Sequence, residues 1–421
     1  MTNLKRPAGT KDYLPELAEK KRYIEDCLND AFSLWGYREV ITPTFEFYDL
    51  LSAGTEVLQT KMYKFFNREG EIMALRPEMT APIARLAAKE MKDRKLPLRL
   101  SYCSNVFRHE SPRAGQYREF YQTGVELLGI DSPMGDTEVI AVAVEAIAKK
   151  LGVKNFNLDI SDVDYYIGIM EEAGLDNQQQ EKIRKSLSEK NLVELEELLV
   201  ASNLTEQQQK AILASNDLRG GKEVLVRAKK LINNKKSKLA LENLAAVYEN
   251  LESFGLAEYV TIDLSVVRKF NYYTGTIFEG YTKDLGYTIC GGGRYDALVK
   301  KFGYPVPAIG FAIGIDRLLL SLEKQDFVFA GQSKRSLIIF SQSEKETAFK
   351  LANQLRANDE IAELKQHQES LAEILAYAKD KKINEILLLS KEDLDYTEQD
   401  YQEVEIADIK TVKIKVGANN E

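Results

Sequence analysis

The sequence predicts an α+β fold: a mostly antiparallel sheet flanked by helices, with a helical insertion and a small C-terminal α/β domain. Its 421 residues exceed what one hydrophobic core normally organises. Strand and helix patterns alternate along residues 1–160 and resume near residue 259, whereas residues 165–256 carry helical spacing alone. A polar linker at 323–335 separates this core, residues 1–325, from a second domain at 336–421.

The first domain begins with a predicted helix at 16–35, where apolar side chains recur at helical spacing and Gly36 provides the stop. The segment 37–43 has strand character and ends at Pro43. Two longer strands follow, at 98–107 and 120–128, separated by a polar loop that contains His109.

The insertion, at about 165–256, is predicted to be helical because Leu244, Val247 and Leu251 lie on one helical face. Residues 205–208 have the form of a capping box, and two consecutive glycines at 220–221 separate two helices. Strand patterns then return at 259–267, 272–281 and 287–290, and an apolar helix is predicted at about 310–322. The C-terminal domain is predicted to contain a strand at 337–340, helices at 346–357 and 370–378, and strands at 386–389 and 412–416.

The composition argues against several classes of protein. The apolar content of 44% suits globular domains, yet no apolar run approaches the ~20 residues that a membrane helix needs. The first residues lack the apolar core of a secretion signal. Three scattered cysteines and only two histidines argue against a disulfide framework and a zinc site. We therefore expect a cytoplasmic protein without a metal.

Acidic charge is concentrated in the C-terminal domain. Residues 336–421 hold 11 Lys and Arg against 18 Asp and Glu, a net charge of −7. The whole chain has 57 basic and 65 acidic residues, so the remaining 46 and 47 nearly cancel. Because neutralisation of phosphates supplies most of the affinity for nucleic acids, we do not expect this domain to bind tRNA.

Three separated segments resemble the motifs of class II aminoacyl-tRNA synthetases. The segment from Gly36 through Pro43 to Glu46 is similar to the first motif, which forms the dimer interface in that family. Residues 107–126 resemble the second motif, and residues 310–317 resemble the third. Residues 75–80, 266–279 and 290–296 resemble histidyl-tRNA synthetases in particular. Each motif alone is weakly specific, but their order and spacing identify a class II synthetase-like core over about residues 5–322.

This resemblance implies a binding site for L-histidine. The six residues concerned are Glu78, Thr80 and Gln122 for the ammonium group, Glu126 and Tyr273 for the imidazole ring, and Arg268 for the carboxylate. A carboxylate and a phenol can satisfy both ring nitrogens, and a guanidinium can donate two hydrogen bonds to a carboxylate. All six positions carry the residue types that recognition of histidine requires.

The nucleotide-binding residues are only partly retained. Arg108, Glu110 and Arg317 match residues that hold ATP in the synthetases. In the loop between the two long strands, however, Ser111 and Gln116 stand where synthetases have arginines. Fixed cations stabilise the charge that develops during adenylation, so their loss indicates a vestigial nucleotide site.

A retained histidine site with altered nucleotide loops is similar to the regulatory subunits of ATP phosphoribosyltransferase. Residues 76–85 and 218–224 also resemble that family. The resemblance implies a non-catalytic subunit within a heteromultimer, whose partner is a short-form catalytic subunit. It also implies a role in the first step of histidine biosynthesis and in allosteric feedback by histidine. A homodimeric core is implied, but no cofactor, tRNA or membrane.

Two other functions remain open at this stage. The first is a catalytically active histidyl-tRNA synthetase, and the second is a class II-like ligase with a different acceptor. The glycines at 291–293 suggest a phosphate loop, but they lack its Gly-Lys-Ser/Thr ending and more often allow close backbone packing near a ligand. The sequence also leaves open whether ATP or AMP binds, and whether histidine lies in the old active site or at a subunit boundary.

Overall fold

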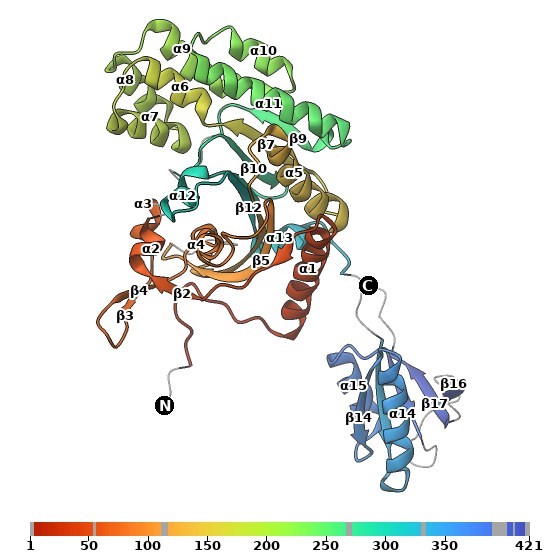
Figure 1. The fold of residues 1–421 in the computed structure, drawn as a ribbon. Helices are drawn as coiled ribbons and strands as arrows, with labels where there is room; N and C mark the ends of the chain where they lie inside the picture. Colours follow the sequence, from red (N-terminus) through yellow and green to blue (C-terminus); the bar gives the residue numbers. More distant parts are fainter. Residues whose placement is uncertain are drawn as a thin grey trace. The chain divides into compact units, whose positions relative to one another are not determined.

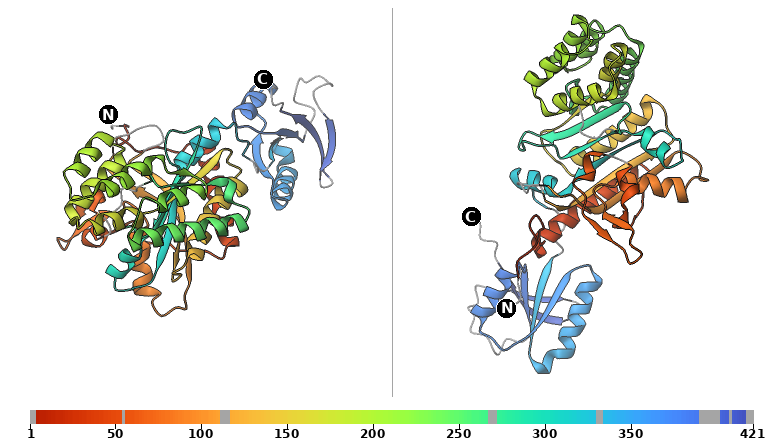
Figure 2. Two further views of the ribbon diagram at one scale, coloured as in Figure 1. Left: turned by 90° about the horizontal axis from the view of Figure 1, so that it is seen from above. Right: turned by 90° about the vertical axis from the view of Figure 1, so that its left-hand side faces the viewer.

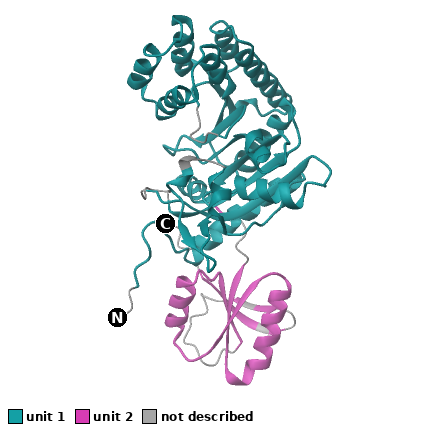
Figure 3. Ribbon diagram, turned by 60° about the vertical axis from the view of Figure 1, so that its left-hand side comes forward, with its two compact units in different colours: residues 1–327 teal, residues 328–421 magenta. Residues whose placement is uncertain are grey.

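The computed structural model describes residues 4–53, 56–110, 117–266, 272–329, 334–389, 402–406 and 409–416. Contacts divide the chain into two compact units, residues 1–327 and residues 328–421 (Figure 3). Each unit has hydrophobic clusters of its own. In the described segments, no helix combines the length and the apolar character needed to cross a membrane.

The first unit is built on a nine-stranded sheet (Figure 1). Only the pairs β1–β5 and β7–β9 are parallel among its described strands, which confirms the predicted α+β fold with a mostly antiparallel sheet. From one edge to the other the strands are β1 (Arg38–Glu39), β5 (Leu98–Phe107), β6 (Glu119–Leu128), β12 (Ala308–Gly314), β11 (Cys290–Arg294), β10 (Thr276–Thr282), β7 (Phe156–Asp162), β9 (Val260–Asp263) and β8 (Arg219–Gly220).

Helices α1 (Pro15–Leu34), α5 (Pro133–Val144) and α13 (Ile315–Lys324) pack on one face of this sheet. Phe311 of β12 meets Phe32 of α1 edge-on, with 5.9 Å between the ring centroids. The predicted helix stop is confirmed: Gly36 follows α1 with a φ of +80°, which side chains disfavour. The opposite face packs against α4 (Thr80–Glu90) and α12 (Asp296–Lys301), and it carries the pocket described below.

A three-stranded antiparallel sheet precedes α4 and was not predicted. It consists of β2 (Phe45–Phe47), β4 (Ile72–Leu75) and β3 (Lys64–Phe66), and the short helices α2 (Tyr48–Ser52) and α3 (Glu56–Gln59) lie between β2 and β3 in the chain. Strands of three or four residues are too short for period-two alternation to be visible in the sequence. One face of this sheet leaves the rings of Phe45 and Phe47 about half exposed.

The insertion between β7 and β9 is helical, as predicted, and forms a separate layer at one end of the unit (Figure 2). Its helices are α6 (Asp164–Glu172), α7 (Asn177–Glu189), α8 (Leu192–Val200), α9 (Glu206–Ala214), α10 (Glu223–Lys229) and α11 (Lys235–Ser253). The capping box at Thr205 and Gln208 is confirmed. The glycine pair lies between α9 and α10, as predicted. Arg219 and Gly220 also form the edge strand β8, which pairs with β9, and Arg219 forms ion pairs with Asp159 of β7 and Asp263 of β9.

Two predictions near the pocket were wrong. Residues 310–314, expected to begin a helix, belong to β12, and α13 begins only at Ile315. A short apolar run does not distinguish a strand from a buried helix without tertiary contacts. The strand predicted at 287–290 instead begins at Cys290 and includes all three glycines of the 291–293 run. Gly292 lies close to the backbone of β12: a Cβ at this position would be 2.1 Å from the carbonyl oxygen of Gly310.

The second unit is a five-stranded sheet with helices on both faces. The strand order is β14 (Ile361–Gln366), β13 (Arg335–Phe340), β15 (Glu385–Leu388), β17 (Ile409–Lys415) and β16 (Gln402–Ile406). Leu337 and Ile339 pack with α15 (Leu371–Asp380), whereas Ile338 and Phe340 pack with α14 (Lys345–Ala357). The predicted α/β pattern is confirmed, but β14 and β16 were missed because both edge strands are largely polar.

Candidate functional site

A cavity of about 150 Å³ lies on the face of the large sheet that α4 covers. Its walls come from β6, β11, β12, the segment before α4 and the tyrosines at 272–273. Seven of the nine predicted site residues line it: Glu78, Thr80, Arg108, Glu110, Gln122, Tyr273 and Arg317. Glu126 lies directly behind the lining and contacts it, as described next. Arg268, and the altered loop with Ser111 and Gln116, lie outside the described residues.

Glu126 is the most deeply buried acidic group of the site, with only 1% of the residue exposed. Its Oε1 accepts a 3.0 Å hydrogen bond from the hydroxyl of Thr80, and its Oε2 accepts a 2.5 Å bond from the hydroxyl of Tyr295. Burial raises the pKa of Glu126 to about 8, although both hydrogen bonds oppose that shift. Glu126 is therefore poised to accept or release a proton near neutral pH.

Glycines on the neighbouring strands make room for this carboxyl group. Glu126 of β6 pairs in register with Gly310 of β12, which pairs in turn with Gly293 of β11. A Cβ at Gly310 would lie 1.7 Å from Oε2 of Glu126, and a Cβ at Gly293 would lie 2.8 Å from the ring of Tyr273. The glycines of this row thus accommodate buried side chains, which supports the packing interpretation of the glycine run.

A second buried carboxylate begins α4. Glu78 accepts hydrogen bonds from the backbone N–H groups of Thr80 at 2.5 Å and Ala81 at 2.9 Å, which have no partner within the helix. Burial raises the pKa of Glu78, and its charge also raises the pKa of Glu126. Two acidic groups that repel each other at one end of a pocket favour a cationic ligand, such as an ammonium group, between them.

Aromatic rings also line the cavity. The rings of Tyr272 and Tyr273 lie 4.8 Å apart, and those of Tyr272 and Tyr295 form an edge-to-face pair at 6.4 Å. Tyr295 was missed as a site residue, although it belongs to the 290–296 segment that carries the family resemblance. Its position beside a glycine-rich strand, with a polar hydroxyl on a buried ring, is the feature that could have identified it.

The three predicted nucleotide residues also line the cavity, and each contacts a protein group. Arg108 donates from Nε to the carbonyl oxygen of Pro77 at 2.6 Å, and Arg317 donates from Nη1 to that of Thr288 at 2.7 Å. Glu110 forms an ion pair with Lys61, with 2.8 Å between Oε1 and Nζ. Burial lowers the pKa of both arginines, but a guanidinium stays charged at any physiological pH. The two guanidinium groups can therefore still attract an anion.

The N-terminal segment contacts one of the residues that line the cavity. Asp316 follows β12 and lines the cavity. It accepts a 2.6 Å hydrogen bond from the hydroxyl of Tyr13 and forms an ion pair with Lys11 at 3.4 Å. Tyr13 also meets the ring of Tyr121 edge-on at 5.8 Å. Among the described residues, no three His, Cys, Asp or Glu side chains are arranged to hold a metal ion.

Comparisons with known proteins place this architecture among synthetase-like chains. The family described as histidyl-tRNA synthetase matches residues 9–318. The ATP phosphoribosyltransferase regulatory subunit of Halothermothrix orenii is 44% identical over 355 residues, which cover 84% of each chain. That of Acetivibrio thermocellus is 40% identical over 351 residues, covering 83% of this chain and 84% of the relative. That of Thermoanaerobacter pseudethanolicus is 38% identical over 364 residues, covering 86% and 95%.

Solved structures agree with the sequence comparisons. A protein of Bacillus halodurans, described as an ATP phosphoribosyltransferase regulatory subunit/histidyl-tRNA synthetase, matches with a TM-score of 0.83 and 34% identity, covering 94% of this chain and all of that one. The apo histidyl-tRNA synthetase of S. aureus matches with a TM-score of 0.68 and 27% identity, covering 98% and 97%. The predicted class II synthetase-like fold is therefore confirmed.

Proposed function

The chain belongs to the family of ATP phosphoribosyltransferase regulatory subunits, and on this premise we propose that it is the histidine-binding regulator of a separate catalytic subunit. Its partner would be a short-form ATP phosphoribosyltransferase, which acts at the first step of histidine biosynthesis. The chain itself would catalyse no reaction and would convey feedback by L-histidine within a cytoplasmic hetero-oligomer.

The observation that carries this proposal is the environment of Glu126. Its carboxyl group lies between the hydroxyls of Thr80 and Tyr295 in a pocket that has a second acid, Glu78, beside it. An imidazole ring of histidine would replace or share these hydrogen bonds, with Tyr273 at its other nitrogen. Its ammonium group would lie near Glu78, Thr80 and Gln122. We assign the carboxylate of the ligand to Arg268 on family resemblance alone.

Calorimetry with L-histidine tests the pocket. Saturable binding by the wild-type chain is expected, and Glu126→Ala should weaken it by roughly 100-fold, the cost of losing a hydrogen bond between charged groups in a buried site. Glu90→Ala, which changes an exposed acid at the end of α4, is the matched control and should bind as the wild type does. An unchanged affinity in Glu126→Ala would refute the pocket assignment.

Regulation requires that histidine bind one state of the complex better than another, typically by ~1–3 kcal/mol. A short-form catalytic subunit should therefore be inactive alone, active with this chain and inhibited by histidine when the two are combined. The same assay with Glu126→Ala should retain activation and lose inhibition. If the mixture showed no gain in phosphoribosyl transfer, the regulatory role would be wrong even if histidine bound.

We also propose that the nucleotide site of Arg108, Glu110 and Arg317 is vestigial and that tRNA is not a partner. The altered loop residues Ser111 and Gln116 support the first point, and the net charge of −7 over residues 336–421 supports the second. The alternative is an active histidyl-tRNA synthetase, which the retention of Arg108 and Arg317 in the cavity favours. Histidine-dependent exchange between ATP and pyrophosphate decides between them: none is expected here, and robust exchange would establish the synthetase.

A homodimeric core completes the proposal. The first synthetase-like motif includes β2, and the exposed face of its small sheet presents Phe45, Phe47 and Phe65. The rings of Phe45 and Phe65 contact each other edge-on at 5.8 Å, so they form a continuous apolar surface. Such a surface is a candidate for pairing with a second copy of the chain.

A further inference from the structure

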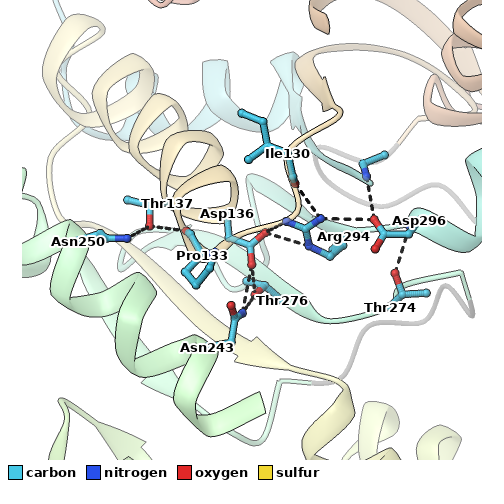
Figure 4. Close-up of polar contacts among 11 residues, drawn as sticks. Ile130, Pro133, Asp136, Thr137, Asn243, Asn250, Thr274, Thr276, Arg294 and Asp296 are labelled. Carbon is cyan, nitrogen blue, oxygen red and sulfur yellow. Dashed lines mark hydrogen bonds and ion pairs between the residues drawn. The ribbon is translucent and has the colours of Figure 1, made fainter. Parts of the chain in front are cut away.

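Arg294 and Asp296, the two neighbours of Tyr295 in the chain, are held by polar contacts (Figure 4). On one side, Arg294 donates from Nε to Oδ1 of Asp136 at 3.1 Å and also pairs with that oxygen through Nη2. On the other side, Asp296 accepts a 2.7 Å hydrogen bond from the backbone N–H of Ala308. The side chains of Arg294 and Asp136 are only 8% and 2% exposed, so neither charge can be hydrated if the pair opens.

The same segment also holds the loop that carries Tyr273. The backbone N–H of Thr274 donates to the carbonyl oxygen of Arg294 at 2.9 Å. The N–H of Asp296 donates in return to the hydroxyl of Thr274 at 3.1 Å. Tyr273 immediately precedes Thr274, so the contacts of residues 294–296 bear on the positions of both Tyr273 and Tyr295, which line the cavity.

The helical insertion reaches this pair through Asn243 of α11. Its Nδ2 donates to the hydroxyl of Thr276 at 2.8 Å and to Oδ2 of Asp136 at 3.2 Å. The hydroxyl of Thr276 donates to the same Oδ2 at 2.7 Å. These two donors fix one oxygen of the carboxylate and thereby direct the other, Oδ1, toward Arg294. Figure 4 shows one further side chain of the insertion, Asn250, which contacts Thr137.

We propose that Asn243 is a positioning residue for the histidine pocket, holding Tyr295 against Glu126 through the Asp136–Arg294 pair. This inference rests on the proposed histidine site. It makes α11 the structural link between the helical insertion and the ligand. Because linkage is reciprocal, anything that displaces α11 lowers the affinity for histidine, and bound histidine in turn holds α11 in place.

Asn250 provides a matched control on the same helix. It lies seven residues after Asn243, about two turns along the same face, and its Nδ2 donates to the hydroxyl of Thr137 at 3.2 Å. Thr137 donates its own hydroxyl proton to the carbonyl oxygen of Pro133 at 2.7 Å, and not to Asp136 (Figure 4). Asn243→Ala and Asn250→Ala therefore each remove an amide that donates from α11 to α5. Only Asn243 also donates to Thr276 and contacts the Asp136–Arg294 pair.

Calorimetry with L-histidine on the full chain is the first measurement. Asn243→Ala should weaken binding roughly tenfold, the effect of one misplaced hydrogen bond to a charged group, while Asn250→Ala stays within about twofold of the wild type. Thr276→Val removes the second donor to Asp136 at nearly constant volume and should weaken binding as Asn243→Ala does. It replaces Asn243→Ala in the measurement if that variant folds poorly. Equal effects of Asn243→Ala and Asn250→Ala would reduce Asn243 to a packing residue and overturn the inference.

A second measurement needs no ligand and separates this inference from the proposed function. Titration of Glu126 by carbon-detected NMR, assigned with Glu126→Gln, reports its hydrogen bond from Tyr295. That bond lowers the pKa of Glu126, so Asn243→Ala should raise the pKa further above the wild-type value of about 8, and Asn250→Ala should not. If wild-type protein failed to bind histidine yet showed this shift, the proposed function would fail and the positioning link would stand. An unchanged pKa in Asn243→Ala would overturn the link itself.

Discussion

Gly310 and Glu126 face each other across neighbouring strands, and the absence of a side chain on Gly310 leaves the space that the carboxyl group fills. The two residues are register partners of β12 and β6. A Cβ on Gly310 would lie 1.7 Å from Oε2 of Glu126 and 2.4 Å from the carbonyl oxygen of Val125. Neither oxygen can move aside easily, because the first is bonded to Tyr295 and the second belongs to the backbone.

Gly310→Ala should therefore damage both stability and binding. Overpacking of a tight core costs ~1–3 kcal/mol, which urea denaturation will detect as a lower midpoint. Displacement of Glu126 should also abolish measurable histidine binding in calorimetry. Gly286→Ala is the control, since a Cβ there meets open space and the expected change is within ~0.5 kcal/mol. Normal histidine affinity in Gly310→Ala would contradict the geometry.

The raised pKa of Glu126 predicts how stability depends on pH. Burial raises this pKa from 4.5 to about 8. Between these two values the folded chain retains a proton that the unfolded chain releases. The free energy of unfolding should therefore fall as the pH rises from about 4.5 and level off above about 8, by on the order of 3–5 kcal/mol in total.

Glu126→Gln isolates this contribution because glutamine cannot ionise. The buried Asp162, whose pKa burial also raises to about 8, changes stability in the same direction in both proteins and cancels in the comparison. Urea midpoints measured from pH 5 to pH 9 should show the wild type losing stability relative to Glu126→Gln as the pH rises. Parallel curves would mean that Glu126 is ionised in the folded chain throughout this range.

The sequence predicted the long elements well and the short ones poorly. The helix ended by Gly36 and the strand β5 were placed within a residue or two, because 10 to 20 residues give a clear period. Strands β2, β3 and β14 were missed, since three to six residues, several of them polar, give no such period. β12 was mistaken for helix because Ile309, Phe311 and Ile313 alternate within a run that is apolar throughout.

The sequence predicted only those site residues that belong to family motifs. The residues around Glu78 and Glu126 come from separate segments, and resemblance to a family was needed to bring them together. Tyr295 and Asn243 were not predicted, because their roles depend on register and on a helix that reaches across from the insertion. No local pattern in the sequence encodes the hydrogen bond between Tyr295 and Glu126, whose residues are 169 positions apart.

The apolar face of the small sheet predicts a dimer that one charge should disrupt. Phe47 is 49% exposed, and Phe47→Glu would place a carboxylate in the proposed subunit interface, where it would be desolvated without a partner. Sedimentation velocity should show a dimer for the wild type and a monomer for this variant. Val226→Glu on α10, where the residue is 61% exposed, is the control and should remain dimeric. A wild-type monomer at micromolar concentration would refute the homodimer.

Loss of a buried acid in the second unit should destabilise that unit without changing the affinity for histidine. Glu385 is 2% exposed on β15, and its Oε1 and Oε2 are paired with Lys334 at 2.7 Å and Lys413 at 2.5 Å. Glu385→Ala removes the anion of Lys413, while Lys334 keeps its ion pair with Glu360 at 3.2 Å. Because both lysines are partly exposed, we expect a loss of ~1–3 kcal/mol rather than the larger cost of a fully buried pair.

Limited proteolysis should detect this loss as faster cleavage within residues 328–421, while the affinity for histidine stays at the wild-type value because the pocket belongs to the first unit. Glu369→Ala breaks a surface pair with Lys365 and should change neither property measurably. Weaker histidine binding in Glu385→Ala would show that the second unit contributes to the ligand site. The pocket of the first unit would then be incomplete without it.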